Sequence, residues 1–171
     1  YPVNIGNKRS TIDYMFDLAR DKCTEEVILF LEDDYLWRND ARLEKLEEAV
    51  KHFGAVTPYD HPDHYQSINK SFLLNEFNGE LFRYCVISTH TFAVKRQLFL
   101  DNWDEFHYGD HDWQMWTKLS TIGVNLWSPI NSYATHLAKG HEALHYNWKE
   151  YYNLLVTNNA VMAKGIKKNV K

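Results

Sequence analysis

Val27-Ile-Leu-Phe-Leu-Glu-Asp-Asp34 is the stretch that decides the fold. Its first five residues form a continuous apolar run rich in strand-forming side chains, typical of a central strand covered on both faces. Three carboxylates follow directly, at the end of the strand where open α/β sheets place their ligand sites. The stretch therefore predicts both an α/β fold and the location of its candidate site.

Helical and strand patterns alternate on both sides of this strand. Ser10 and Asp13 form a capping box for a first helix, and a second helix, capped by Asn39 or Asp40, is expected to end at Gly54. The intervening segment 58–80 is rich in turn-forming residues, which indicates a long surface loop with at most one strand. Helices are predicted over 11–21, 96–102, 111–121 and 146–162, and strands over 55–57, 81–94 and 125–128, the last closed by Pro129. The alternation predicts a mixed sheet flanked by helices.

The composition indicates one globular domain, over 1–162, followed by a basic tail over 163–171. Of the 171 residues, 44% are hydrophobic and 25% are charged, and the formal net charge is -4. An acidic balance argues against a nucleic-acid partner. Without a long apolar run or a signal peptide, a cytoplasmic protein is expected, with at most peripheral membrane contact. Cys23 and Cys85 lie in apolar segments and are expected to be buried free thiols.

Glu32, Asp33 and Asp34 repel one another, so packing alone explains them poorly. A divalent cation compensates such a cluster, and magnesium or manganese commonly joins one or two carboxylates to the phosphates of a nucleotide. Side chains alternate along an extended chain, which places Glu32 and Asp34 on one side and Asp33 on the other. A solvated acidic turn that caps the next helix is the alternative.

Three motifs in order resemble the family-2 glycosyltransferases, which transfer sugars from nucleotide donors. The first is Asn4-x-Gly6, a helix, and the strand that ends in Glu-Asp-Asp34, which is similar to the family's D-x-D-type cluster. His111-Asp-Trp-Gln-Met-Trp-Thr-Lys-Leu119 resembles its E-D-W-D-x-W-x-R-L segment. Pro129-Ile-Asn-Ser-Tyr-Ala-Thr-His136 resembles the closing segment in which a histidine completes a metal site. Together the motifs span positions 4 to 136.

The resemblance implies a GT-A-like, Rossmann-like fold and an inverting, metal-dependent transfer from a nucleotide-diphosphate sugar to a hydroxyl of a glycan or other acceptor. Asp34 and His136 would bind the metal, with manganese favoured over magnesium. Asp33 would contact the ribose or a metal-bound water, and Glu32 would support the cluster. Asp112 would be the general base.

Arg9, which follows the first motif, is a candidate contact for a donor phosphate, although a surface arginine is the alternative.

The chain also departs from the family pattern. The strand and helix that bind base and ribose in the family do not precede Tyr1, so the domain is expected to be incomplete at its start. His111 and Gln114 replace acids of the second motif, and Asp110 is a rival for the base role.

His141-Glu-Ala-Leu-His145 matches the zinc-peptidase signature H-E-x-x-H, which needs a third ligand downstream. After Glu150 the sequence offers no aspartate, glutamate or histidine, so this hypothesis is weak. The same histidines could begin the terminal helix or belong to a flap over the donor. A non-catalytic carbohydrate-binding domain and a nucleotidyltransferase or metal-dependent phosphoesterase remain as alternatives.

Overall fold

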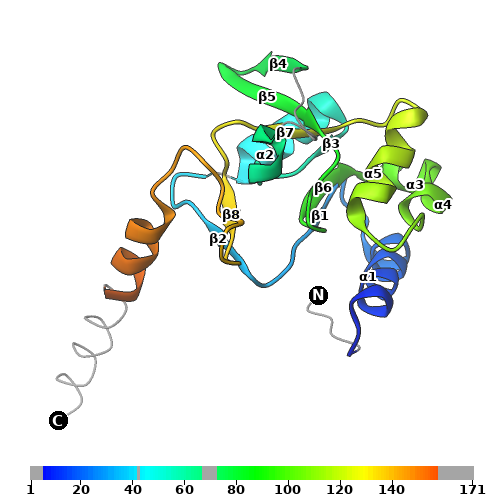
Figure 1. Cartoon of the computed structure of the whole chain (residues 1–171). Helices are drawn as coiled ribbons and strands as arrows, with labels where there is room; N and C mark the ends of the chain where they lie inside the picture. Colours follow the sequence, from blue (N-terminus) through cyan, green and yellow to red (C-terminus); the bar gives the residue numbers. More distant parts are fainter. Residues whose placement is uncertain (1–5, 42, 67–72, 158–171) are drawn as a thin grey trace, which may run out of the picture.

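A six-stranded mixed sheet lies at the centre of the computed structural model, which describes residues 6–41, 43–66 and 73–157 (Figure 1). In spatial order its strands are β1 (Val27–Phe30), β6 (Phe92–Lys95), β3 (Ala55–Val56), β7 (Leu126–Pro129), β5 (Glu80–Cys85) and β4 (Leu74–Phe77). Neighbours β3 and β7 run parallel, and the other pairs are antiparallel. A separate two-stranded sheet pairs β2 (Tyr35–Trp37) with β8 (Ala134–His136).

Helices cover both faces of the large sheet. The helices are α1 (Lys8–Lys22), α2 (Leu43–Phe53), α3 (Arg96–Asp101), α4 (Trp103–Phe106) and α5 (Asp112–Thr121), with a 3-10 turn η1 (Pro62–Tyr65) and a helix over 148–157. On one face, Phe16 of α1 and Trp116 of α5 belong to an aromatic core with Phe30 and Phe92. On the other face, α2 packs its buried side chains against Val56 and its neighbours. The expectation of an α/β fold with a mixed, helix-flanked sheet is confirmed.

The prediction that 27–31 forms a central strand is wrong in one respect. Both faces of β1 are covered, because Ile28 belongs to the first core and Leu29 packs against the second. Within the described sheet, however, β1 pairs with β6 alone and lies at the edge. Apolar side chains report the burial of the two faces, whereas the number of paired neighbours depends on backbone hydrogen bonds that the pattern does not encode.

The start of the first helix differs from the predicted cap. The cap of α1 is Asn7, whose side chain accepts a hydrogen bond from the backbone N–H of Ser10 at 2.8 Å. Asp13 therefore lies inside the helix, where it pairs with Arg9. The second helix is described from Leu43, and the carboxylate of Asp40 binds Arg38. Residue 42 lies outside the described ranges, so the predicted cap at Asn39 or Asp40 stays a prediction.

The stretch 81–94 is not one strand but forms β5 and β6, separated by residues 86–91. The other predicted elements agree with the structure within a few residues, and three short ones were missed. The long loop contains η1 and β4, its residues 67–72 lie outside the described ranges, and Pro129 belongs to β7 instead of closing it. The missed elements are β2, β8 and α4, each of three or four residues. The predicted terminal helix is described over 148–157, and both 158–162 and the basic tail lie outside the described part.

The expected free thiols are present. Cys85 is buried and Cys23 is half-buried, and burial raises the pKa of the Cys85 thiol. Within the described ranges, the helices are too short or too polar to cross a membrane.

Candidate metal and ligand site

The pairing of β2 with β8 brings two distant parts of the chain to one place. Tyr35 lies opposite His136 in this small sheet, and the backbone N–H of Leu137 donates to the carbonyl of Asp34 at 2.8 Å. As a result, Nε2 of His136 and Oδ2 of Asp34 are 2.8 Å apart, although the residues are 102 positions apart in sequence. The predicted meeting of Asp34 and His136 is therefore present in the fold.

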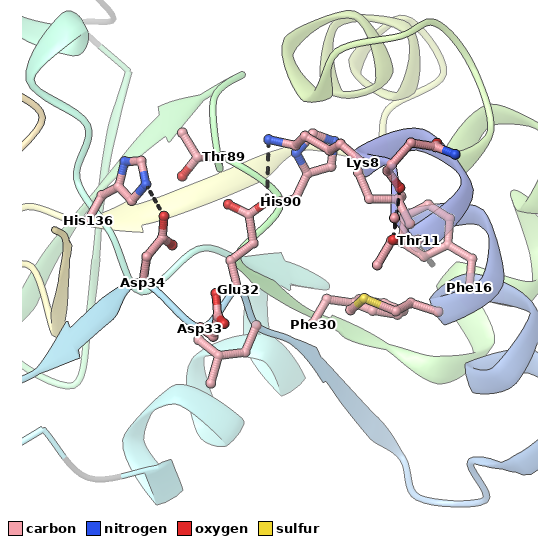
Figure 2. Close-up of a pocket in the computed structure, with 15 residues that line it drawn as sticks. Lys8, Thr11, Phe16, Phe30, Glu32, Asp33, Asp34, Thr89, His90 and His136 are labelled. Atoms are coloured by element: carbon pink, nitrogen blue, oxygen red, sulfur yellow. Dashed lines mark hydrogen bonds and ion pairs between the residues drawn. The ribbon is translucent and has the colours of Figure 1, made fainter. Parts of the chain in front are cut away.

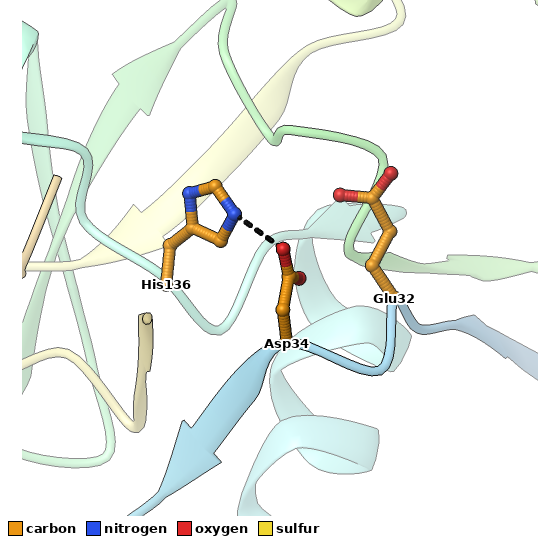
Figure 3. A group of neighbouring side chains, drawn as sticks. All are labelled: Glu32, Asp34 and His136. Carbon is orange, nitrogen blue, oxygen red and sulfur yellow. Dashed lines mark hydrogen bonds and ion pairs between the residues drawn. The ribbon is translucent and has the colours of Figure 1, made fainter. Parts of the chain in front are cut away.

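Glu32 completes a group of three candidate ligands (Figure 3). Glu32, Asp34 and His136 each offer one ligand atom, and these atoms lie within 4.8 Å of one another. Two ligand atoms on opposite sides of a cation, each bound at about 2.1 Å, are about 4.2 Å apart. A small movement of these side chains is therefore enough for all three to bind one cation. Two carboxylate oxygens suit manganese or magnesium, and an imidazole, which is a ligand of transition metals, makes manganese the better fit of the two. The donor set therefore fits the expected divalent metal.

Neighbouring rings fix the position of His136. Its imidazole stacks on Tyr35 with ring centroids 5.3 Å apart, and its side chain is only 15% exposed. Nδ1 is buried and has no hydrogen-bond partner within the described part of the chain. A neutral imidazole that binds a cation through Nε2 carries its proton on Nδ1. The ring therefore presents Nε2 to the candidate site in a fixed orientation.

A cavity of about 740 Å³ opens beside the three ligands (Figure 2). Its acidic wall is formed by Glu32, Asp33 and Asp34, whose position follows the end of β1. The opposite wall includes the first turn of α1, where Lys8 places its Nζ 3.3 Å from Oε1 of Glu32. Burial raises the pKa of Glu32, the Lys8 charge opposes that rise, and the Asp34 charge adds to it. The cavity thus has an acidic side and a cationic side.

The turn at 88–90 forms a further part of the cavity wall. Thr89 and His90 both adopt left-handed backbone conformations, with φ of 47° and 61°, which are uncommon for residues other than glycine. Oδ2 of Asp112 accepts hydrogen bonds from the backbone N–H groups of Ser88 and Thr89, each at 2.6 Å. Trp116 also donates to the hydroxyl of Ser88 at 2.9 Å. The start of α5 therefore holds this turn in place.

Asp112, the predicted base, is buried and is not among the residues that line the cavity. Thr89 lies between it and the cavity, since Thr89 binds Asp112 through its backbone and contributes to the cavity wall. All described hydrogen bonds of Asp112 involve Oδ2. The observed interaction of Asp112 is structural, and its base role stays a prediction.

Arg9 lies outside the cavity lining, contrary to its proposed phosphate contact. Its guanidinium binds the backbone carbonyls of His107, at 2.9 Å, and Gly109, and its Nη2 pairs with Asp13 at 3.1 Å. These contacts fasten α1 to the turn before α5.

Asp33 lines the cavity but is not one of the three grouped ligands, as the alternation of side chains predicts.

Sequence reasoning missed Lys8, Thr89 and His90 as residues of the site. Lys8 had a recognisable signal, because it follows the Asn4-x-Gly6 motif at the start of a predicted helix. Thr89 and His90 had none, since neither residue type indicates a left-handed turn. Of the tryptophans that could stack on a sugar ring, Trp116 and Trp127 are buried in the core, and Trp113 is half exposed.

The H-E-x-x-H segment does not form a peptidase site. That motif requires a helix that presents both histidines on one face, whereas residues 141–145 precede the helix over 148–157 and form coil and turn. His141 contacts His61, with ring nitrogens 3.3 Å apart, and His145 contacts the hydroxyl of Tyr65 at 3.1 Å. The two histidines therefore have different partners and belong to a segment that covers Tyr59, whose hydroxyl binds the carbonyl of His141.

No model of a known protein family matches this chain, and no curated protein matches it significantly. The resemblance to the family-2 glycosyltransferases consequently rests on the three motifs, of which the first and the third bring residues to the cavity.

Proposed function

We propose that this chain is a metal-dependent glycosyltransferase domain of the GT-A type that uses a nucleotide-diphosphate sugar. The observation that carries the proposal is the 2.8 Å approach of His136 to Asp34 across 102 residues of sequence. Two motifs that resemble the same family from different parts of the chain supply these two side chains. Their convergence beside a cavity large enough for a nucleotide-sized ligand supports a shared role in binding.

Glu32, Asp34 and His136 would hold a divalent cation, with manganese favoured. Such a cation stabilises the negative charge that develops on a leaving diphosphate. Asp33 also lines the cavity but is not one of the three grouped ligands, and it would contact the ribose or a bound water. Lys8 replaces Arg9 as the cation available to donor phosphates, because Arg9 is occupied by backbone carbonyls.

In the proposed transfer, an acceptor hydroxyl oxygen forms a bond with the anomeric carbon of the donor sugar. The bond from that carbon to the phosphate oxygen breaks, and its electron pair leaves with the nucleoside diphosphate. The hydroxyl proton passes to a general base, and Asp112 can take this role through Oδ1 only if Thr89 moves aside, because Asp112 lies behind Thr89 and its described hydrogen bonds go to Oδ2. Attack from the face opposite the diphosphate inverts the anomeric centre.

The test is a screen for release of nucleoside diphosphate from a panel of nucleotide sugars, with manganese, with magnesium and with EDTA. We expect release with at least one donor and manganese, and none with EDTA. Asp34→Asn and His136→Ala should each lower the rate about 100-fold or more. Asp40→Asn and His52→Ala remove the same residue types from exposed positions outside the cavity and should leave the rate unchanged.

Full activity of the Asp34 and His136 variants, or of the wild type in EDTA, would refute the metal assignment. Donor binding that requires manganese but yields no product with any acceptor or water would instead favour a binding domain. Release of sugar 1-phosphate as the first product would refute the transferase: with free nucleoside monophosphate beside it, it would identify a phosphoesterase, and with the nucleoside monophosphate bound to another acceptor, a nucleotidyltransferase.

A further inference from the structure

Lys8 is the one residue with a permanent positive charge among the described residues that line the cavity, and its partner is a candidate metal ligand. We propose that Lys8 changes partners when the site fills: it pairs with Glu32 before the metal binds, and with the donor diphosphate afterwards. Metal and donor then bind cooperatively through this exchange. The inference rests on the proposed function, because it assigns Lys8 to the same donor.

The Lys8–Glu32 pair is suited to exchange because it is weak. Nζ and Oε1 are 3.3 Å apart, and the two side chains are 63% and 27% exposed. An ion pair this exposed favours the paired over the separated side chains by a factor of about 1.5 to 5. The bond between a divalent cation and the Glu32 carboxylate is stronger than this and can displace Lys8. Figure 2 shows Lys8 reaching from α1 across the top of the acidic wall toward Glu32.

Charge explains the order of events. Before a cation binds, Glu32, Asp33 and Asp34 place three carboxylates on one wall of the cavity, and a diphosphate would be repelled. A divalent cation bound to Glu32 reduces the negative charge that holds Lys8. The ammonium is then free to approach the diphosphate, which carries the largest negative charge that the filled cavity would contain.

The start of α1 strengthens this cationic wall. The helix has 15 residues, and its first turn contains no acidic side chain, so the positive end of its dipole is not compensated locally. Lys8 is the first residue of this helix, and Gly6 and Asn7 line the cavity beside it. Lys8 and the helix dipole therefore favour an anion at the same place, opposite the metal ligands.

The test compares Lys8→Gln with Lys45→Gln. Lys45 pairs with Glu80 at 2.5 Å, and neither residue lines the cavity. The side chains of this control pair are 52% and 24% exposed, which is close to the exposure of Lys8 and Glu32. Manganese binding to the whole chain is measured first, from the electron paramagnetic resonance signal of free manganese. Calorimetry then follows the binding of manganese pyrophosphate to manganese-saturated protein.

We expect Lys8→Gln to bind manganese alone about two- to five-fold more tightly, because Lys8 no longer competes for Glu32. The same variant should bind manganese pyrophosphate about ten-fold more weakly, because a charge-assisted contact is lost. Lys45→Gln should change neither affinity. Opposite signs of the two effects exclude a general disturbance of the cavity, which would weaken both ligands. In Glu32→Gln, which removes the partner of Lys8, the Lys8→Gln change should no longer tighten manganese binding, whereas a plain effect of the Lys8 charge would persist.

Wild-type protein that binds manganese, together with a Lys8→Gln variant that binds it equally or less tightly, would overturn the exchange and leave the metal site intact. Unchanged pyrophosphate affinity in Lys8→Gln would overturn it as well. Failure of the wild type to bind manganese would overturn this inference and the proposed function together. Cooperative binding without donor cleavage would support the exchange and refute the transferase.

Discussion

Replacing Asp112 by alanine is expected to destabilise the fold, beyond any effect on transfer. The carboxylate accepts backbone N–H groups of Ser88 and Thr89, each at 2.6 Å, and the hydroxyl of Ser88 at 3.2 Å. Ser88 is fully buried, so water cannot easily replace the lost acceptor. Hydrogen bonds to a charged group contribute about 1.5–3 kcal/mol each. All three share Oδ2 and are therefore not additive, so we expect a loss of about 3–5 kcal/mol, less than their sum.

Urea unfolding followed by circular dichroism measures this loss in the free energy of unfolding. Thermal unfolding measures it independently: for a domain of this size, 1 kcal/mol of lost stability lowers the melting temperature by about 2–4 °C, so a fall of about 6–20 °C is expected. Asp112→Asn keeps one acceptor oxygen and should lose only about 1–2 kcal/mol. Asp110→Ala, at an exposed neighbouring position, is the control and should stay within about 0.5 kcal/mol of the wild type.

A loss below about 1 kcal/mol in Asp112→Ala would refute the conclusion that this carboxylate holds the turn at 88–90. The asparagine variant separates the two roles of Asp112. If it folds and lacks transfer, the general-base assignment gains support, whereas folded protein with full transfer would leave Asp112 as a positioning residue alone.

Two further predictions concern stability. Burial lowers the pKa of His61 and of His90 to about 4, below about 6.5 in the unfolded chain, so protonation favours unfolding as the pH falls from 6.5 to 4. The free energy of unfolding, from urea titrations at pH 7.5, 6 and 4.5, should decline by about 1–3 kcal/mol per ring over this range, and a flat profile would contradict neutral buried imidazoles. Gly109→Ala should lose about 1–3 kcal/mol in thermal unfolding, because Gly109 has φ of 77° and a Cβ there would lie 2.7 Å from Cβ of Gln114. Gly79→Ala, with the same φ of 77° but nothing within 4 Å, is its control and should lose less.

Local patterns predicted most helices and strands because each depends on a few neighbouring residues. The apolar run that became β1 and the glycine that ends α2 are examples, since Gly54 adopts φ of 93°. Strands β2 and β8 escaped prediction because each has only three residues, which are too few to show a periodicity. Their pairing depends on contacts about 100 residues apart in sequence.

The sequence by itself determined that a buried strand would end in carboxylates, with Glu32 and Asp34 turned to one side. Only the tertiary structure decided that His136 would meet them, that Lys8 would face Glu32, and that Arg9 would be tied to backbone carbonyls. The physical reason is the distance along the sequence over which each kind of interaction acts. Side-chain alternation and capping act over a few residues, whereas the partner of a charged or ring side chain is set by how distant segments pair and pack.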